Sequence, residues 1–124
     1  HTNVMMCVAD KFAVICLDAI RDKQERLMVS GSLKESGKEI IDISLQQMNA
    51  FAGNMLQVRN SEGELLLVMS SLAFGSLNKT QVSKLEKFSR IIHTPLDTIE
   101  SCGGGSARCM MAEIFNKNSK HISF

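Results

Sequence analysis

A run of glycines beside a cysteine is the part of the sequence best suited to chemistry. Residues 102–109 are Cys-Gly-Gly-Gly-Ser-Ala-Arg-Cys. Packing does not explain three consecutive glycines, whereas a backbone that adopts positive φ or approaches a ligand closely does. Cys109 follows this run, and the neighbouring Arg108 can help to stabilise a thiolate, which is the nucleophilic form of cysteine. The pattern therefore makes Cys109 a candidate nucleophile.

Three other interpretations of this segment stay open. A flexible connector is the simplest. A phosphate-binding loop is disfavoured because the segment lacks the Gly-Lys-[Ser/Thr] ending and a clear helix after it. A zinc site built from Cys102, Cys109 and His93 matches no standard ligand spacing and has no obvious fourth ligand. We therefore predict no metal ligands.

The remaining cysteines and histidines have less suggestive surroundings. Cys7 and Cys16 lie in apolar runs and are expected to be small core residues. Four cysteines in 124 residues are too few for a disulfide scaffold, and together with eight methionines they favour a reducing compartment, so we predict a cytoplasmic protein. His93 ends a short predicted strand and is expected to be structural, whereas His121 lies in a polar tail.

Composition excludes several classes of protein. The chain is long enough for one modest domain with a core. A formal net charge of +1 gives no electrostatic basis for binding nucleic acid or a membrane surface. The longest apolar run, Leu65–Met69, is far shorter than the roughly 20 residues that span a bilayer. Because the chain opens on His1 without an initiator methionine, we expect further sequence upstream.

The first half of the chain predicts a β-β-α-β order. Apolar runs at Val4–Val8 and Phe12–Leu17, separated by three turn-like residues, predict a hairpin. Residues 22–35 have apolar positions at helical spacing, and Gly37 supplies a helix stop. The isoleucines of residues 40–43 then predict a short strand.

The second half predicts the same order again. Met55–Val58 and Leu65–Met69 are strand-like, and turn residues lie between them. Asn78 is a helix cap, and the helix is expected to reach about Phe88. Arg90–His93 predicts the closing strand.

The two halves align as an internal repeat. A spacing of 51 or 52 residues relates the pairs Asn3 and Asn54, Leu33 and Leu85, and Ile40 and Ile92. A repeat of this length indicates one supersecondary unit packed against copies of itself, although coincidental spacing of two unrelated modules is the alternative. We predict units at 1–50 and 51–115, the second including a final strand from about Arg108 through Cys109 to Phe115, followed by a polar tail at 116–124.

Residues 103–110 resemble the C-terminal Gly-Gly-Gly-x-x-Arg-Cys-Met signature of arginine deiminase and its relatives. These enzymes form the guanidino- and ureido-modifying amidinotransferase, or pentein, superfamily. From His1 to Phe115 the chain is most similar to its bacterial citrulline-utilisation hydrolases. The resemblance implies an α/β fold, a five-bladed propeller of ββαβ units of which this chain supplies about two. Exposed blade edges then predict self-association or contact with missing N-terminal blades.

The resemblance also assigns roles at the start of the chain. The superfamily has its catalytic histidine on a His-x-Asp motif at the start of a blade, and His1-Thr2-Asn3 occupies that place. It implies that His1 is the general acid and base, unless His1 simply begins the sequence. Asn3 departs from the pattern: Asp pairs with a cationic guanidinium, whereas neutral Asn suits a ureido group. Asn3 therefore favours citrulline or a related amino acid, unless its role is structural.

The implied mechanism is covalent. The Cys109 thiolate attacks the ureido carbon, and His1 protonates the leaving nitrogen and then activates water. Gly104, Gly105 and Arg108 are expected to bind substrate beside Asn3, and no metal or organic cofactor is needed. The superfamily's acidic substrate-gripping residues lie upstream, so this chain alone is expected to be inactive. An arginine deiminase or amidinotransferase acting on a guanidinium, and a non-catalytic module that keeps the fold, are the alternatives.

Overall fold

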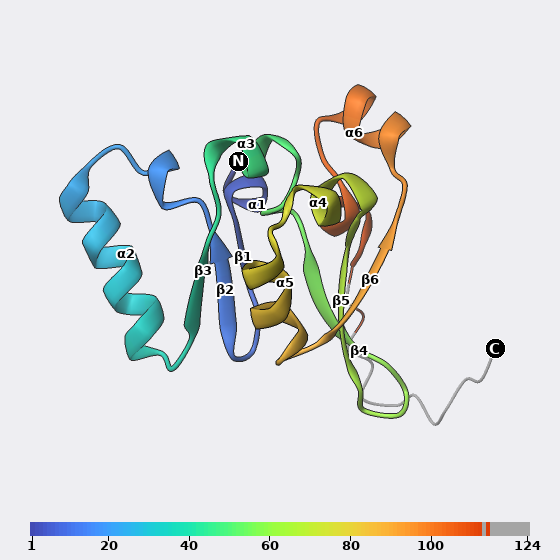
Figure 1. Cartoon of the computed structure of the whole chain (residues 1–124), viewed down its shortest axis with the longest axis horizontal. Coiled ribbons are helices and arrows are strands. Elements are labelled where there is room, and N and C mark those ends of the chain that lie inside the picture. Colours follow the sequence, from blue (N-terminus) through green and yellow to red (C-terminus); the bar gives the residue numbers. More distant parts are fainter. Residues whose placement is uncertain (113, 115–124) are drawn as a thin grey trace.

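The structure is a computed structural model that describes residues 1–112 and 114. Two three-stranded sheets form its frame (Figure 1). The first sheet has the order β1 (Met6–Val8), β2 (Phe12–Ile15) and β3 (Glu39–Asp42). The second has the order β4 (Leu56–Arg59), β5 (Leu65–Ser70) and β6 (Arg90–Thr94). In each sheet the first pair of strands is antiparallel and the second pair is parallel.

Helices connect the parallel strands and cover one end of the sheets. Parallel pairing requires a crossover, which α2 (Lys23–Glu35) supplies in the first sheet and α5 (Lys79–Glu86) in the second. Three short helices cluster at the upper end in Figure 1: α3 (Leu45–Asn49), α4 (Ser71–Ser76) and α6 (Asp97–Gly103). The remaining turns are α1 (Thr2–Met5) and the 3-10 turns η1 (Leu17–Ala19) and η2 (Ala107–Met110).

Side chains at the helix starts explain where the two crossover helices begin. The Asp22 carboxylate accepts hydrogen bonds from the backbone nitrogens of Gln24 and Glu25, at 2.7 and 3.1 Å. Asn78 caps α5 in a reciprocal capping box with Gln81. Gly37, at φ +79°, ends the segment after α2 in a conformation that favours glycine.

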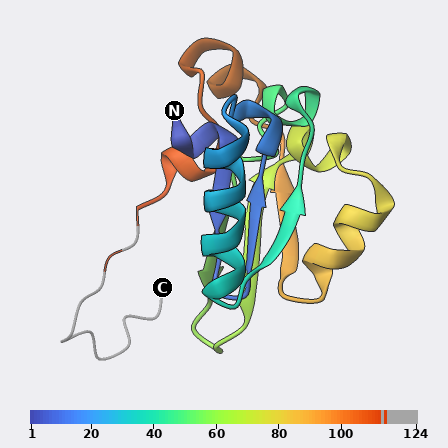
Figure 2. The ribbon, with the colours of Figure 1, turned by 90° about the vertical axis from the view of Figure 1, so that its left-hand side faces the viewer.

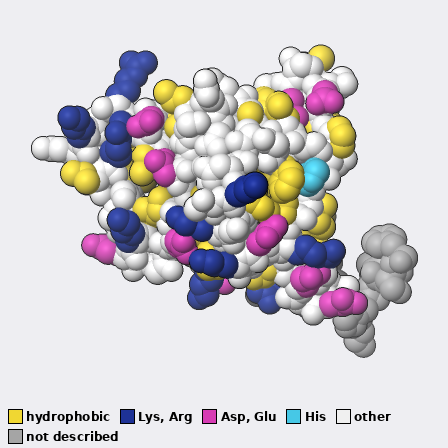
Figure 3. All heavy atoms as spheres, in the orientation of Figure 1, with side chains coloured by type: hydrophobic (Ala, Val, Ile, Leu, Met, Phe, Trp, Pro, Cys, Tyr) yellow, Lys and Arg dark blue, Asp and Glu magenta, His cyan; other side chains and the backbone are white. Residues whose placement is uncertain are grey.

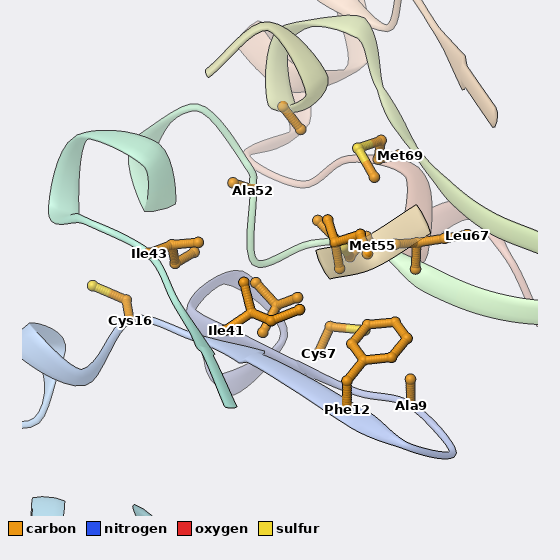
Figure 4. Packing of buried hydrophobic residues seen from close by; sticks show 13 residues of the cluster. Cys7, Ala9, Phe12, Cys16, Ile41, Ile43, Ala52, Met55, Leu67 and Met69 are labelled. Carbon is orange, nitrogen blue, oxygen red and sulfur yellow. The ribbon is translucent and has the colours of Figure 1, made fainter. Parts of the chain in front are cut away.

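One hydrophobic core joins the two sheets. Cys7, Phe12 and Ile41 of the first sheet point toward Leu67 and Met69 of the second (Figure 4). Phe12 also stacks on the ring of Phe88, with centroids 5.2 Å apart. Because this shared core fixes the sheets against each other, the starts of β1 and β4 have a defined relation, which matters for the site below.

The predicted strands and crossover helices are present, with shifted ends. The first strand begins at Met6 rather than Val4, because residues 2–5 form α1. The final strand predicted to begin near Arg108 is wrong: Ala107–Met110 is the 3-10 turn η2, in which the Cys109 nitrogen bonds the Ser106 oxygen at 3.1 Å. Residues 113 and 115–124, which include the predicted tail, lie outside the described residues.

Charged side chains of both signs lie on the surface. On the face in Figure 3, basic and acidic side chains are interspersed. Within residues 1–112, no helix has the length and hydropathy needed to cross a membrane. The unit boundaries at residues 50 and 115 and the predicted self-association stay predictions.

Candidate active site

A cavity of about 350 Å³ lies between the start of the chain and the glycine loop. Its walls are formed by His1, Asn3, Val4, Gly103, Gly104, Gly105 and Cys109. Figure 2 shows the elements that bring them together, with α1 in dark blue beside η2 in orange-red. The fold thus gathers five of the six residues that sequence analysis assigned to a site, from positions about 100 residues apart in the chain.

The two halves of the repeat meet under this cavity. Asn3 and Asn54, which occupy matching positions of the repeat, are in contact: the Asn54 Nδ2 donates to the backbone oxygen of Asn3 at 2.6 Å. The neighbouring Gly53 allows this approach, because a Cβ there would collide with the Val4 carbonyl and lie 2.9 Å from the Met5 carbonyl carbon. The segments that lead into β1 and β4 are therefore held together at the base of the site.

Cys109 lies on the exposed side of this junction with its sulfur held in place. Its Sγ accepts a hydrogen bond from the Asn54 Nδ2 at 3.2 Å. Asn54 is fully buried, and its Oδ1 accepts from the Ser106 backbone nitrogen at 3.0 Å. One buried amide thus contacts the thiol, the glycine loop and the start of the chain.

Two glycines of the loop serve distinguishable purposes. Gly104 ends α6 at φ +67°, a left-handed conformation that costs other residues strain. Gly105 makes room for the thiol, since a Cβ on it would lie 2.8 Å from the Sγ and 3.0 Å from the Cβ of Cys109. The backbone at residue 105 is therefore part of the wall against which the sulfur rests.

A buried carboxylate supports the loop from below. Glu100, only 6% exposed, accepts hydrogen bonds on Oε2 from the hydroxyl of Ser70 at 3.0 Å and from that of Ser106 at 3.2 Å. Ser70 ends β5 and caps α4. Glu100 therefore ties the glycine loop to the second sheet.

Comparison with known proteins places this arrangement in a family. Residues 1–116 match the sequence profile of the eukaryotic N,N dimethylarginine dimethylhydrolase family. The chain belongs to this family. Among solved structures, it resembles the apo form of ArgZ, a cyanobacterial arginine dihydrolase of the ornithine–ammonia cycle, with a TM-score of 0.67 and 18% identity. No curated protein sequence matched the chain.

The match to the arginine dihydrolase covers 89% of this chain and 16% of that enzyme, so the chain spans a small part of its structural relative. At 18% identity, this similarity shows a shared fold only. Dimethylarginine dimethylhydrolase family membership and this likeness together confirm the pentein-type superfamily and an α/β fold of its kind. The number of blades, and the expected closeness to citrulline-utilisation hydrolases, stay predictions.

In this member of the dimethylarginine dimethylhydrolase family, all four cysteines are free and only two are exposed. Cys7 and Cys16 are core residues, as predicted. Burial raises the pKa of the Cys7 thiol to about 11, and the charge of Arg108 offsets part of that rise. Burial likewise raises the pKa of Cys16. At neutral pH both are protonated and enclosed, which leaves Cys102 and Cys109 as the thiols that solvent reaches.

Arg108 and His93 lie apart from the cavity wall. The Arg108 guanidinium donates from Nη1 to the Met6 oxygen at 3.1 Å, and so braces the start of β1; its role in substrate binding stays a prediction. His93 shares a hydrogen bond with the Ser71 hydroxyl at 2.9 Å and stacks on Phe74 at a centroid distance of 4.2 Å. These contacts agree with the structural role expected for His93.

Sequence analysis missed Asn54, Glu100 and Ser106 as site residues. Asn54 carried one usable signal, since it matches Asn3 in the repeat and follows a glycine just before a strand. Glu100 carried none, because it lies in a polar stretch typical of a solvated loop, whereas Ser106 lies within the run 102–109 but occupies a position that the signature leaves open. Across residues 1–112 no cluster of three histidine, cysteine or acidic side chains is placed to hold a metal ion.

Replacement of Gly105 by alanine should displace the thiol. The new Cβ meets the Cys109 side chain at 2.8 Å, so the sulfur must leave its place against the loop. We expect turnover by the complete protein to fall about 100-fold, the scale of a misplacement near 1 Å. Gly103→Ala is the matched control, since a Cβ there meets nothing within 4 Å. Equal activities of the two variants would contradict the assigned role of Gly105.

Proposed function

We propose that this chain carries the nucleophile of a cysteine-dependent hydrolase that cleaves a C–N bond of a guanidino group. One observation carries the proposal: a solvent-accessible thiol, held by a buried amide, shares a cavity with a histidine in a chain of the dimethylarginine dimethylhydrolase family. A nucleophile and a potential proton carrier around one cavity form the minimal apparatus for covalent hydrolysis.

In the proposed reaction the Cys109 thiolate attacks the central guanidino carbon and forms a C–S bond. The tetrahedral intermediate then breaks its bond to one nitrogen, and His1 supplies the proton with which that nitrogen leaves as an amine. Water, deprotonated by His1, attacks the same carbon and the thiolate departs. The net change converts a guanidino group and water into a ureido group and an amine, without a metal or an organic cofactor.

A guanidino substrate is preferred because the matched family and the similar solved structure are both named after guanidino compounds. These are dimethylarginine and arginine. N,N-dimethylarginine and arginine are thus the first substrates to test. A ureido substrate such as citrulline is the second candidate, since Asn3 lines the cavity and offers a neutral amide. The residues that line the described cavity include no carboxylate. We therefore propose that the acidic groups that bind the guanidinium cation lie in another part of the protein, and that this chain alone is inactive.

A substrate panel on the complete protein tests the proposal. N,N-dimethylarginine, arginine and citrulline are supplied separately, and released amine and ureido product are measured. Turnover of either guanidino compound supports the proposal. Turnover of citrulline alone would transfer the assignment to ureido hydrolysis, and no turnover of any of the three by folded protein would contradict it.

A further inference from the structure

We propose that Asn54 is a further catalytic residue, which stabilises the Cys109 thiolate by a hydrogen bond from its side-chain amide. The inference rests on the proposed function, because it assumes that Cys109 is the nucleophile. Asn54 lies 55 residues before Cys109 in the chain and contacts its Sγ at 3.2 Å.

The partners of Asn54 fix the orientation of its amide. The Ser106 backbone nitrogen can only donate, so the atom 3.0 Å from it must be the Asn54 oxygen. The Asn3 backbone oxygen can only accept, so the atom bonded to it must be the Asn54 nitrogen. With one hydrogen of the NH₂ group committed to Asn3, the other faces the sulfur.

This donor is preorganised. Asn54 is fully buried, and its neighbours on both sides are backbone groups that do not rotate away. The loop that supplies the Ser106 nitrogen is itself held through the Ser106 hydroxyl and the buried Glu100 carboxylate. A donor fixed before reaction favours the anionic sulfur over the neutral thiol without reorganisation, which is the condition under which such groups are most effective.

The Asn54→Asp variant removes this donor with little change of shape but adds a negative charge beside the sulfur, so Asn54→Ser, which removes the donor without adding charge, is measured alongside it. The retained oxygen can still accept from Ser106, while the second oxygen replaces the NH₂ group beside the sulfur. We measure alkylation by iodoacetamide at each cysteine of the complete protein, resolved by peptide mass spectrometry. A hydrogen bond to a charged group corresponds to roughly 10-fold or more in rate, so Cys109 should label at least about 10-fold more slowly at pH 7. Asn49→Asp makes the same change at an exposed helix end and should leave labelling unaltered.

The dependence on pH separates this role from a purely structural one. Near pH 11 most thiols are ionised, so the native protein and Asn54→Asp should label Cys109 at converging rates. A constant ratio of rates at all pH values, or an unchanged rate at pH 7, would overturn the proposal. The Asn54→Ser side chain is too short to reach the sulfur, so slower labelling of Cys109 at pH 7 is expected in both variants. Labelling of buried Cys7 and Cys16 would reveal unfolding of Asn54→Asp, in which case Asn54→Ser alone carries the test.

Labelling of the native protein distinguishes a failure of the proposed function from a failure of the role given to Asn54. Cys109 should label faster than Cys102, the other exposed cysteine, which lies near the end of α6. If it does not, the nucleophile assignment fails whatever Asn54 does. If it does, but Asn54→Asp labels like the native protein, only the role of Asn54 fails.

Discussion

Replacement of Cys109 by serine should lower turnover by the complete protein by at least about 10³-fold, the scale of loss when a catalytic nucleophile is removed. An alcohol has a much higher pKa than a thiol, and it attacks a planar guanidino or ureido carbon poorly without a dedicated base. The substituted side chain still fits, because serine has nearly the shape of cysteine and Cys109 is exposed. The measurement is steady-state turnover with the best substrate of the panel.

Cys102→Ser is the matched control for this variant. Cys102 is the other exposed thiol, seven residues earlier in the last turn of α6, and it does not line the cavity. It should retain most of the activity. If Cys109→Ser kept near-normal turnover, or if Cys102→Ser removed it, the assignment of the nucleophile would be wrong.

The second large effect is expected at His1. His1→Gln keeps a polar side chain but cannot carry a proton, so turnover should fall about 10²- to 10⁴-fold, the usual contribution of a general acid or base. Because His1 acts both when the amine leaves and when water attacks, the covalent adduct should form more slowly and also decay more slowly than in the native protein. Rapid-quench mass spectrometry of the protein checks both parts of this result.

His93→Gln is the control for the role of His1. His93 is bonded to Ser71 and stacked on Phe74, outside the set of residues that line the cavity. The loss of turnover in His93→Gln should therefore be at least about 10-fold smaller than the loss in His1→Gln. Activity lost equally in both variants would mean that His1 has no special part in proton transfer.

The fold was predictable where local pattern and tertiary environment agree. Leu65–Met69 is apolar, follows turn residues and belongs to β5, the central strand of its sheet, so the run of Leu and Val was a sound guide. The segment after Arg108 shows the opposite case. Its apolar residues suggested a strand, but the Met111 nitrogen bonds the Arg108 oxygen at 3.2 Å, and the chain turns after the buried Ser106 and Ala107. Local propensity cannot foresee such a turn, because distant partners hold Ser106.

The site was predictable as far as one motif and one resemblance reached. His1, Asn3, Gly104, Gly105 and Cys109, which line the cavity, each belong to a short run of residues that could be recognised in the sequence. The residues that hold Cys109 were not found, since their partners are distant in the sequence: Asn54 acts on Cys109 and Ser106, and Glu100 on Ser70. A polar residue whose burial depends on long-range packing resembles any surface residue in the sequence.

The covalent adduct tests the central claim most directly. The complete protein is mixed with N,N-dimethylarginine, quenched in acid during turnover, digested and analysed by mass spectrometry. The proposed mechanism predicts that the peptide containing Cys109 gains the mass of the substrate less dimethylamine, and that the peptides of Cys7, Cys16 and Cys102 stay unmodified. Turnover with an unmodified Cys109 peptide in both the native protein and His1→Gln, or with the adduct on another residue, would contradict the account.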